Sequence, residues 1–172
     1  MTDLYARLAH SPARHLEDLM RASPSPDLDS IAGWDWAGFN TPVTTTLLGI
    51  RKFIKVFEHG TAGVEGYNLR ANGTSLDEPW VPRGHDRARS KVGLYAVQPP
   101  HTHPGPYRHA ALIDYGARPD QFWLARSIDD YLVQPDESEP DVLLGKAYLC
   151  VGRWRVPAGY FILERLRPIA RR

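Results

Sequence analysis

The chain has 172 residues, of which 42% are hydrophobic and 24% are charged, and its net charge is +1. This length fits one domain with a core of its own, and a charge so near zero gives no overall attraction to nucleic acid or to an anionic membrane. Cys150 is the only cysteine, which excludes an internal disulfide and is typical of a cytoplasmic protein. We expect one cytoplasmic domain over residues 1–172, with no membrane span and no signal peptide.

The first 22 residues have the spacing of short helices. An apolar stripe at intervals of three and four residues runs from Leu4 to Met20. Alternating serine and proline then end the helical pattern. We expect residues 1–22 to form a helical lid or brace on the main body, and residues 23–30 to form a linker.

From residue 31 onward the pattern becomes that of short strands. Trp34 and Trp36 are two residues apart, and glycine and proline separate the later segments. Eight segments have strand character: residues 31–40, 51–58, 64–70, 91–98, 109–115, 121–133, 142–151 and 156–166. We expect the sixth to be interrupted near Asp129 and Asp130, and a short helix to lie over residues 41–49.

Eight sequential strands without helix-length crossovers predict a mostly β fold of antiparallel strands. Such a chain hides its sheet edges by closing into a barrel or by stacking as a two-sheet β-sandwich, and the pattern alone allows both. We expect a barrel over residues 31–166, followed by a basic tail over residues 167–172. An eight-stranded barrel has room for one small ligand.

This layout resembles the lipocalin-like, or calycin, architecture. Those barrels begin with a helical turn that leads to a Gly-x-Trp strand, and an arginine late in the chain packs on the tryptophan. Here Gly33 precedes Trp34 and Trp36, and Arg165 lies in the last strand. The spacing departs from Gly-x-Trp, and the C-terminal helix of secreted members is missing. The resemblance implies a barrel with a cavity and does not specify a ligand.

Aromatic residues concentrate on the predicted strands. If Trp34, Trp36, Tyr148 and Tyr160 point inward, they form an apolar pocket with a few hydroxyl and indole donors, as is usual for small-molecule sites. The alternative is that these rings fill a solid core.

Charged residues also interrupt the strands. Asp35, Asp114, Lys146 and Glu164 have apolar neighbours, and a charge buried there is costly unless it is paired. Lys146 and Glu164 lie on consecutive antiparallel strands, where they can face each other as polar anchors for a ligand. Asp114 and Glu164 are the candidates for a general acid or base. The alternative is that each of these side chains points into water.

Three histidines, His101, His103 and His109, lie within nine residues. A His-x-His pair can supply two metal ligands, but this pair precedes Pro104 and Pro106 in an irregular segment. We therefore interpret the three as solvated loop histidines, keep them as the candidates for a metal site, and expect neither a metal nor another cofactor.

A basic group, Arg51, Lys52 and Lys55, has the composition of a phosphate or nucleic-acid contact. Because no nucleic-acid-binding motif accompanies it, we interpret it as a solvated face.

Three hypotheses about function follow. The first is a barrel that binds a small, largely apolar molecule between Trp34, Trp36, Tyr148 and Tyr160, with Lys146 as a polar anchor. The second is a cofactor-independent isomerase, cyclase or hydrolase that acts on a hydrophobic substrate in the same cavity. A buried carboxylate within hydrogen-bond reach of a second titratable group would favour it. The third is a protein-interaction module, which would have a packed interior and a wide exposed apolar patch.

Overall fold

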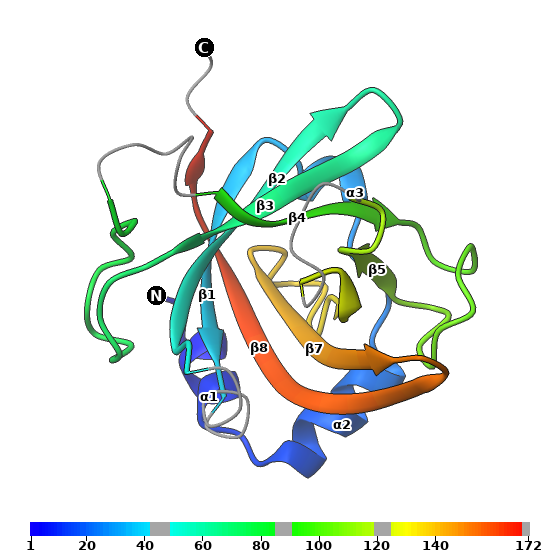
Figure 1. Cartoon of the computed structure of the whole chain (residues 1–172). Coiled ribbons are helices and arrows are strands. Elements are labelled where there is room, and N and C mark those ends of the chain that lie inside the picture. The colour runs from blue at the N-terminus through cyan, green and yellow to red at the C-terminus, as the bar shows by residue number, and fades with distance from the viewer. Residues whose placement is uncertain (42–48, 85–90, 119–124, 170–172) are drawn as a thin grey trace.

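A closed antiparallel barrel is the main feature of the computed structural model, which describes residues 1–41, 49–84, 91–118 and 125–169 (Figure 1). In these ranges eight strands pair in chain order, and β1 pairs with both β2 and β8. The strands are β1 (Trp34–Asn40), β2 (Lys52–Gly60), β3 (Gly63–Arg70), β4 (Lys91–Gln98), β5 (Ala111–Asp114), β6 (Ile128–Val133), β7 (Val142–Val151) and β8 (Trp154–Pro168).

The expected mostly β fold with a barrel is therefore confirmed, and the sandwich alternative is excluded because the first and last strands are hydrogen-bonded to each other. The expected interruption near Asp129 and Asp130 is wrong, since both residues pair with β5 and β7 inside β6. The helix expected over 41–49 falls mostly on residues 42–48, which lie outside the described residues. β8 also runs on to Pro168, into the expected tail.

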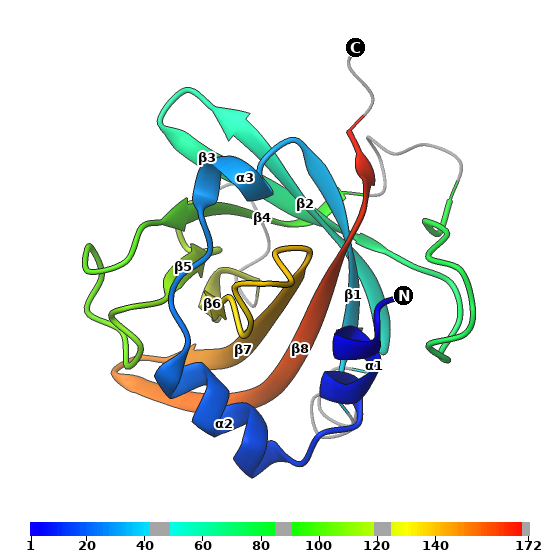
Figure 2. The same ribbon diagram turned by 180° about the vertical axis from the view of Figure 1, so that it is seen from behind.

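Three helices precede the barrel: α1 (Asp3–Ala9), α2 (Ala13–Ala22) and α3 (Leu28–Ile31). α1 packs on β8 and α2 packs on β7, along the outside of the barrel (Figure 2). Leu8, Leu16 and Met20 are buried there against outward-facing residues such as Leu144 and Ile162. The N-terminal helices thus cover a wall of the barrel. α3 is a single turn that begins inside the segment expected to be a linker, residues 23–30, and ends one residue beyond it.

Side chains alternate between the two faces of each strand, and this alternation decides what enters the barrel. On β2, Phe53 and Lys55 face the interior cavity described below, whereas Ile54 and Val56 pack with Tyr67 in a separate cluster outside it.

The end of the barrel next to α3 is closed by a stack of aromatic rings and an arginine. The Arg165 guanidinium lies 4.7 Å from the ring centre of Trp34 and 5.0 Å from that of Trp36. Its Nη1 donates to the carbonyl oxygen of Ser30 at 3.0 Å, and its Nε donates to Asp141 at 2.6 Å. Because Arg165 joins α3, β1 and the segment before β7, it holds this end of the barrel together.

Replacing this arginine is expected to weaken the closed end. Arg165→Gln removes two cation–π contacts and a charge-assisted hydrogen bond, so we expect the free energy of unfolding in urea to fall by about 1–3 kcal/mol. Arg153→Gln is the matched control, because Arg153 also stacks on a tryptophan but is exposed at the β7–β8 turn. Its effect should stay within about 0.5 kcal/mol. Equal losses in the two variants would contradict the role given to Arg165.

Candidate functional site

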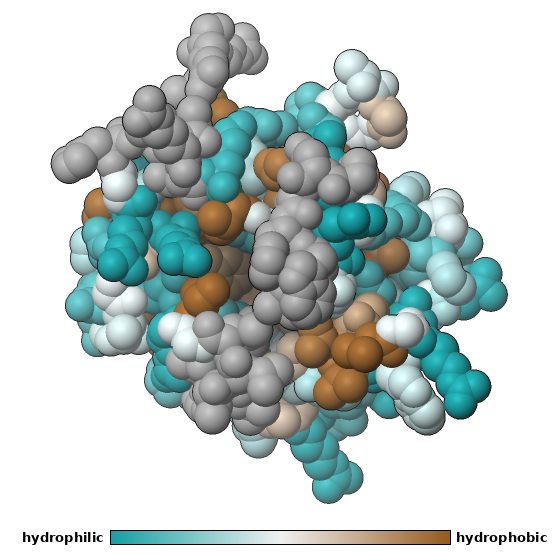
Figure 3. Space-filling model, viewed as in Figure 1, coloured by the Kyte–Doolittle hydropathy of each residue, from teal (hydrophilic) through white to brown (hydrophobic). Residues whose placement is uncertain are grey.

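The barrel contains a cavity of about 330 Å³ that opens to solvent, at the end away from α3. Its apolar wall includes Phe53, Ile128, Ala147 and Phe161, which come from four different strands. This volume lies near the lower end of the roughly 300–1,000 Å³ typical of small-molecule sites. Figure 3 shows apolar side chains on this face of the molecule beside the grey atoms near its centre.

A buried polar cluster lies on one side of this cavity. Lys55 Nζ donates to Tyr115 Oη at 2.8 Å and to Asp130 Oδ2 at 3.1 Å. Tyr115 Oη donates to the same carboxylate oxygen at 3.0 Å and accepts a hydrogen bond from Asn68 Nδ2 at 3.0 Å. The buried Oδ1 of Asn68 has no hydrogen-bond partner among the described residues. Asn68 Oδ1 is therefore available to accept a hydrogen bond from a ligand.

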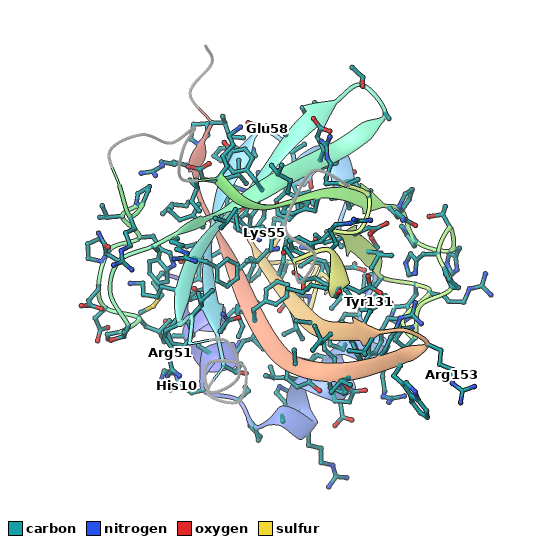
Figure 4. The ribbon with its side chains drawn as sticks, viewed as in Figure 1. His10, Arg51, Lys55, Glu58, Tyr131 and Arg153 are labelled. Carbon is teal, nitrogen blue, oxygen red and sulfur yellow. The ribbon has the colours of Figure 1, made fainter. Side chains whose placement is uncertain are left out.

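Aromatic rings surround the amino group of Lys55, which is labelled inside the ring of strands in Figure 4. Its Nζ lies 4.8 Å from the ring centre of Tyr95, 5.2 Å from that of Tyr115 and 5.3 Å from that of Phe161. The side chain is 1% exposed, and that of Asp130 is 6% exposed. Both charges are thus removed from water, and each is stabilised by the opposite charge of the other.

Burial shifts the protonation equilibria of this pair toward the neutral forms. It lowers the pKa of Lys55, although the charge of Asp130 opposes the shift. It also raises the pKa of Asp130, against the attraction of Lys55. Burial and the nearby Asp130 charge hold the pKa of Tyr115 well above its usual value. A proton can therefore move within this cluster at a lower energetic cost than between the same groups in water.

The interpretation of Arg51, Lys52 and Lys55 as a solvated face is wrong for Lys55, which is buried inside the barrel. Lys52 is also buried: its Nζ donates to the carbonyl oxygens of Ser75 and Glu78 and lies 3.9 Å from the Trp80 ring centre. The sequence does hold a signal, because Lys55 lies between Phe53 and Phe57 at a spacing of two and so shares their face.

Lys146, Tyr148 and Tyr160, expected to point into the barrel, lie on its outer wall instead. Lys146 pairs with Tyr160 across β7 and β8, and their neighbours Ala147 and Phe161 are the residues that face the cavity. The expectation that Lys146 faces Glu164 is also wrong, since Glu164 pairs with Val142 in the register of the two strands.

A second polar cluster forms where this outer wall meets α2. The Glu17 carboxylate accepts hydrogen bonds from Lys146 Nζ at 2.6 Å, Tyr160 Oη at 2.7 Å and Tyr107 Oη at 2.9 Å. Partial burial alone would raise the pKa of Glu17, but these three hydrogen bonds outweigh it and lower the pKa to about 2. A polar pocket of about 330 Å³, with Tyr148 and His109 in its wall, adjoins the cluster. The cluster fastens α2 to the barrel.

Trp34 and Trp36 belong to the closed end and lie apart from the cavity. Trp36 is fully buried, and its indole Nε1 donates to the carbonyl oxygen of Ile31 at 3.1 Å.

Asp114, Glu164 and Asp35, the carboxylates considered from the sequence, have local structural partners. Asp114 accepts a hydrogen bond from Gln98 at 2.8 Å. Glu164 accepts one from the backbone N–H of Thr2, next to the start of α1. Asp35 forms an ion pair with Arg167 at 3.1 Å. None of the three is among the described residues that line the cavity.

Two of the three clustered histidines bind backbone carbonyls. A ring nitrogen of His103 lies 3.0 Å from the Ala110 carbonyl oxygen, and one of His109 lies 3.0 Å from that of Met20. His101 is exposed. Over the described ranges, no group of three histidine, cysteine or acidic residues is arranged to hold a metal ion.

A basic groove of about 490 Å³ adjoins the mouth of the cavity. Ile50 and Arg70 line both the groove and the cavity, and Arg51, Lys52 and Arg83 line the groove as well. The described lining of the groove contains no acidic residue. The charged side chains of this lining are cationic, and the Glu78 carboxylate lies beside it, where it accepts hydrogen bonds from the backbone N–H groups of Thr74 and Ser75.

No family model, curated protein or solved structure matches this chain. Among the helices that the structure describes, none has both the length and the apolar character to cross a membrane.

The buried ion pair predicts a large coupling between its two members. Lys55→Met or Asp130→Val alone leaves an unpaired buried charge, and each should lower the free energy of unfolding by about 3–5 kcal/mol. The double variant should lose less than either single variant. Lys91→Met is the control, because Lys91 contacts neither residue of the pair in the described structure and its effect should add to that of Asp130→Val. Additive losses for Lys55→Met and Asp130→Val in urea unfolding would contradict the pairing.

The outer cluster predicts a specific pH dependence of stability. Since folding lowers the pKa of Glu17 from 4.5 to about 2, its contribution is present above pH 4.5 and is lost as the pH falls toward 2. The difference in unfolding free energy between the native chain and Glu17→Gln should therefore shrink over this range. The exposed carboxylate Glu137 provides the control, and Glu137→Gln should track the native chain. A difference that does not change with pH would contradict this account.

Proposed function

We propose that the barrel binds a small, largely apolar molecule in its cavity. The observation that carries the proposal is the combination of an apolar wall with one buried polar cluster, Lys55, Asn68, Tyr115 and Asp130, at the cavity surface. Apolar walls supply binding energy, and a few polar groups fix the orientation of the ligand. The Lys55 amino group and the unpartnered Asn68 acceptor lie in this cluster, which favours a ligand with a single polar group at its inner end.

The basic groove favours a particular charge on the outer end of the same ligand. A molecule that fills the cavity and extends past Arg70 would place its outer group beside Arg51 and Arg83. An acidic outer group is therefore favoured over a neutral or basic one.

We further infer that the barrel is of the lipocalin-like type. At the closed end, Arg165 of the last strand packs on Trp34 and Trp36, as the resemblance implies. The helical turn α3 leads into the first strand, which is the second feature of that architecture. This inference supports a binding cavity and does not specify a ligand.

A cofactor-independent enzyme in the same cavity is the second candidate. The specific observation in its favour is a buried carboxylate, Asp130, within hydrogen-bond reach of both Lys55 and Tyr115. Asp130 and Tyr115 would then act as general base and acid, in place of the Asp114 and Glu164 expected from the sequence. The interaction module is less well supported, because a cavity within the barrel departs from the packed interior it requires.

A substitution at the mouth tests the binding proposal. The probe is 1-anilinonaphthalene-8-sulfonate, which is apolar with one anionic group and fluoresces when it leaves water. Val92 lines the cavity mouth and is 40% exposed, so Val92→Trp should narrow the entrance and leave the fold intact. We expect the dissociation constant of the probe to rise at least about tenfold, or about 1.4 kcal/mol.

Val156→Trp is the matched control, since Val156 is 49% exposed on β8 and does not line the cavity. Its affinity for the probe should equal that of the native chain. Equal effects of the two substitutions, or no saturable binding to the native chain, would overturn the proposal. Native mass spectrometry of the protein from its own host should in addition show a bound molecule.

A further inference from the structure

Lys55 is one of four lysines in the chain, and the other three are held away from the cavity. Lys52 donates to backbone carbonyls, Lys91 lies over the ring of Tyr67 at 3.9 Å, and Lys146 is paired with Glu17 on the outer wall. Lys55 is the only lysine among the described residues that line the cavity.

The surroundings of this amino group suit a nucleophile. A lysine amine becomes nucleophilic when its proton can be taken up nearby and when it lies in an apolar, desolvated site. Asp130, at 3.1 Å, is positioned to take that proton, and the shifts of both pKa values described above lower the cost of the transfer. Phe53 and Phe161 place an apolar wall beside the amine, against which a carbonyl compound would be held.

We propose that Lys55 forms an imine with a small, apolar aldehyde or ketone that occupies the cavity. This inference rests on the proposed function, since the carbonyl compound must first bind in the cavity, and it adds the chemical class of the ligand.

Formation of the imine needs only Lys55, Asp130 and the carbonyl compound. The Lys55 ammonium passes one proton to Asp130, and the free amine forms a bond to the carbonyl carbon. The attacking nitrogen gives up one of its two remaining protons to the former carbonyl oxygen, which yields a neutral carbinolamine. Its hydroxyl group then takes the proton from Asp130 and leaves as water, while the nitrogen lone pair forms the C=N bond. An ammonium and a carbonyl compound thus give an iminium and water, with no change in total charge and no oxidant or reductant.

The same cluster is suited to the product. The iminium is a cation at the position of the former ammonium, so Asp130 would serve as its counter-ion and the rings of Tyr95 and Phe161 would remain beside it. Once Asp130 has taken the proton from Lys55, the Tyr115 hydroxyl, whose oxygen lies 2.8 Å from Nζ, no longer has a carboxylate acceptor and is placed to donate to the carbonyl oxygen during attack. A positive intermediate is therefore stabilised by groups that already stabilise the ammonium.

The test uses 4-isopropylbenzaldehyde, an apolar aldehyde without a second reactive group, and sodium cyanoborohydride, which reduces an imine to a stable amine. The whole chain is incubated with both, and its mass is measured intact and after digestion. We expect one adduct per chain, with the mass of the aldehyde less one oxygen, located on the peptide that carries Lys55.

Two variants control for loss of folding. Lys55→Met should abolish the adduct, and the double variant Lys55→Met with Asp130→Val, expected to fold better than the single one, should also form none. Lys91→Arg removes a lysine outside the cavity and should be labelled like the native chain. Val92→Trp should slow labelling by the same factor by which it weakens probe binding.

The outcomes separate this inference from the proposed function. If the aldehyde displaces 1-anilinonaphthalene-8-sulfonate but leaves no adduct on Lys55, the imine is excluded while binding stands. If the adducts are spread over all four lysines and the N-terminus, the special reactivity of Lys55 is excluded. If neither the aldehyde nor the fluorescent probe binds, the proposed function fails as well.

Discussion

The Lys55–Asp130 ion pair crosses the interior of the barrel and constrains what surrounds it. Three strands separate β2 from β6 in either direction around the barrel, so the pair joins opposite walls. Two buried charges of opposite sign persist only when they are close and well hydrogen-bonded. Tyr115 and Asn68 complete the hydrogen bonding on the cavity side, and the packed rings of Trp36 and Phe57 fill the barrel toward α3. The pair thus separates a solid end from a hollow one.

The outer wall uses polar residues for a different purpose. Glu17, Lys146 and the tyrosines around them attach α2 to β7 and β8, where the apolar residues of the helices also pack. Removing one partner from an ion pair that is partly open to water costs less than removing one from a buried pair, and here several short hydrogen bonds fix the orientation of the groups. Both polar clusters join a lysine, a carboxylate and a tyrosine, and only the inner one faces a cavity with apolar walls. Position in the fold, and not composition, therefore distinguishes the functional candidate from the brace.

The proposed function of this barrel rests on the contrast between the cavity wall and its polar cluster. An apolar wall favours a ligand that water excludes, and the amine, phenol, carboxylate and amide groups favour one particular end of that ligand. The arginines of the neighbouring groove add a preference at the mouth. On these three features, the ligand we propose is an elongated molecule with an apolar middle.

The sequence by itself determined the eight strands, their antiparallel order and the two N-terminal helices, because alternation, helical spacing and glycine or proline breaks are local signals. It did not determine which charges enter the barrel. Asp35, Lys146 and Glu164 were as plausible as Lys55, since all four lie on predicted strands among apolar residues, and Asp130 lies where an interruption of the strand was expected. Only closure of the barrel decided this, because closure set which face of each strand points inward. It also placed β2 opposite β6, so that Lys55 pairs with Asp130, which lies 75 residues further along the chain. Partners so distant in sequence leave no local pattern.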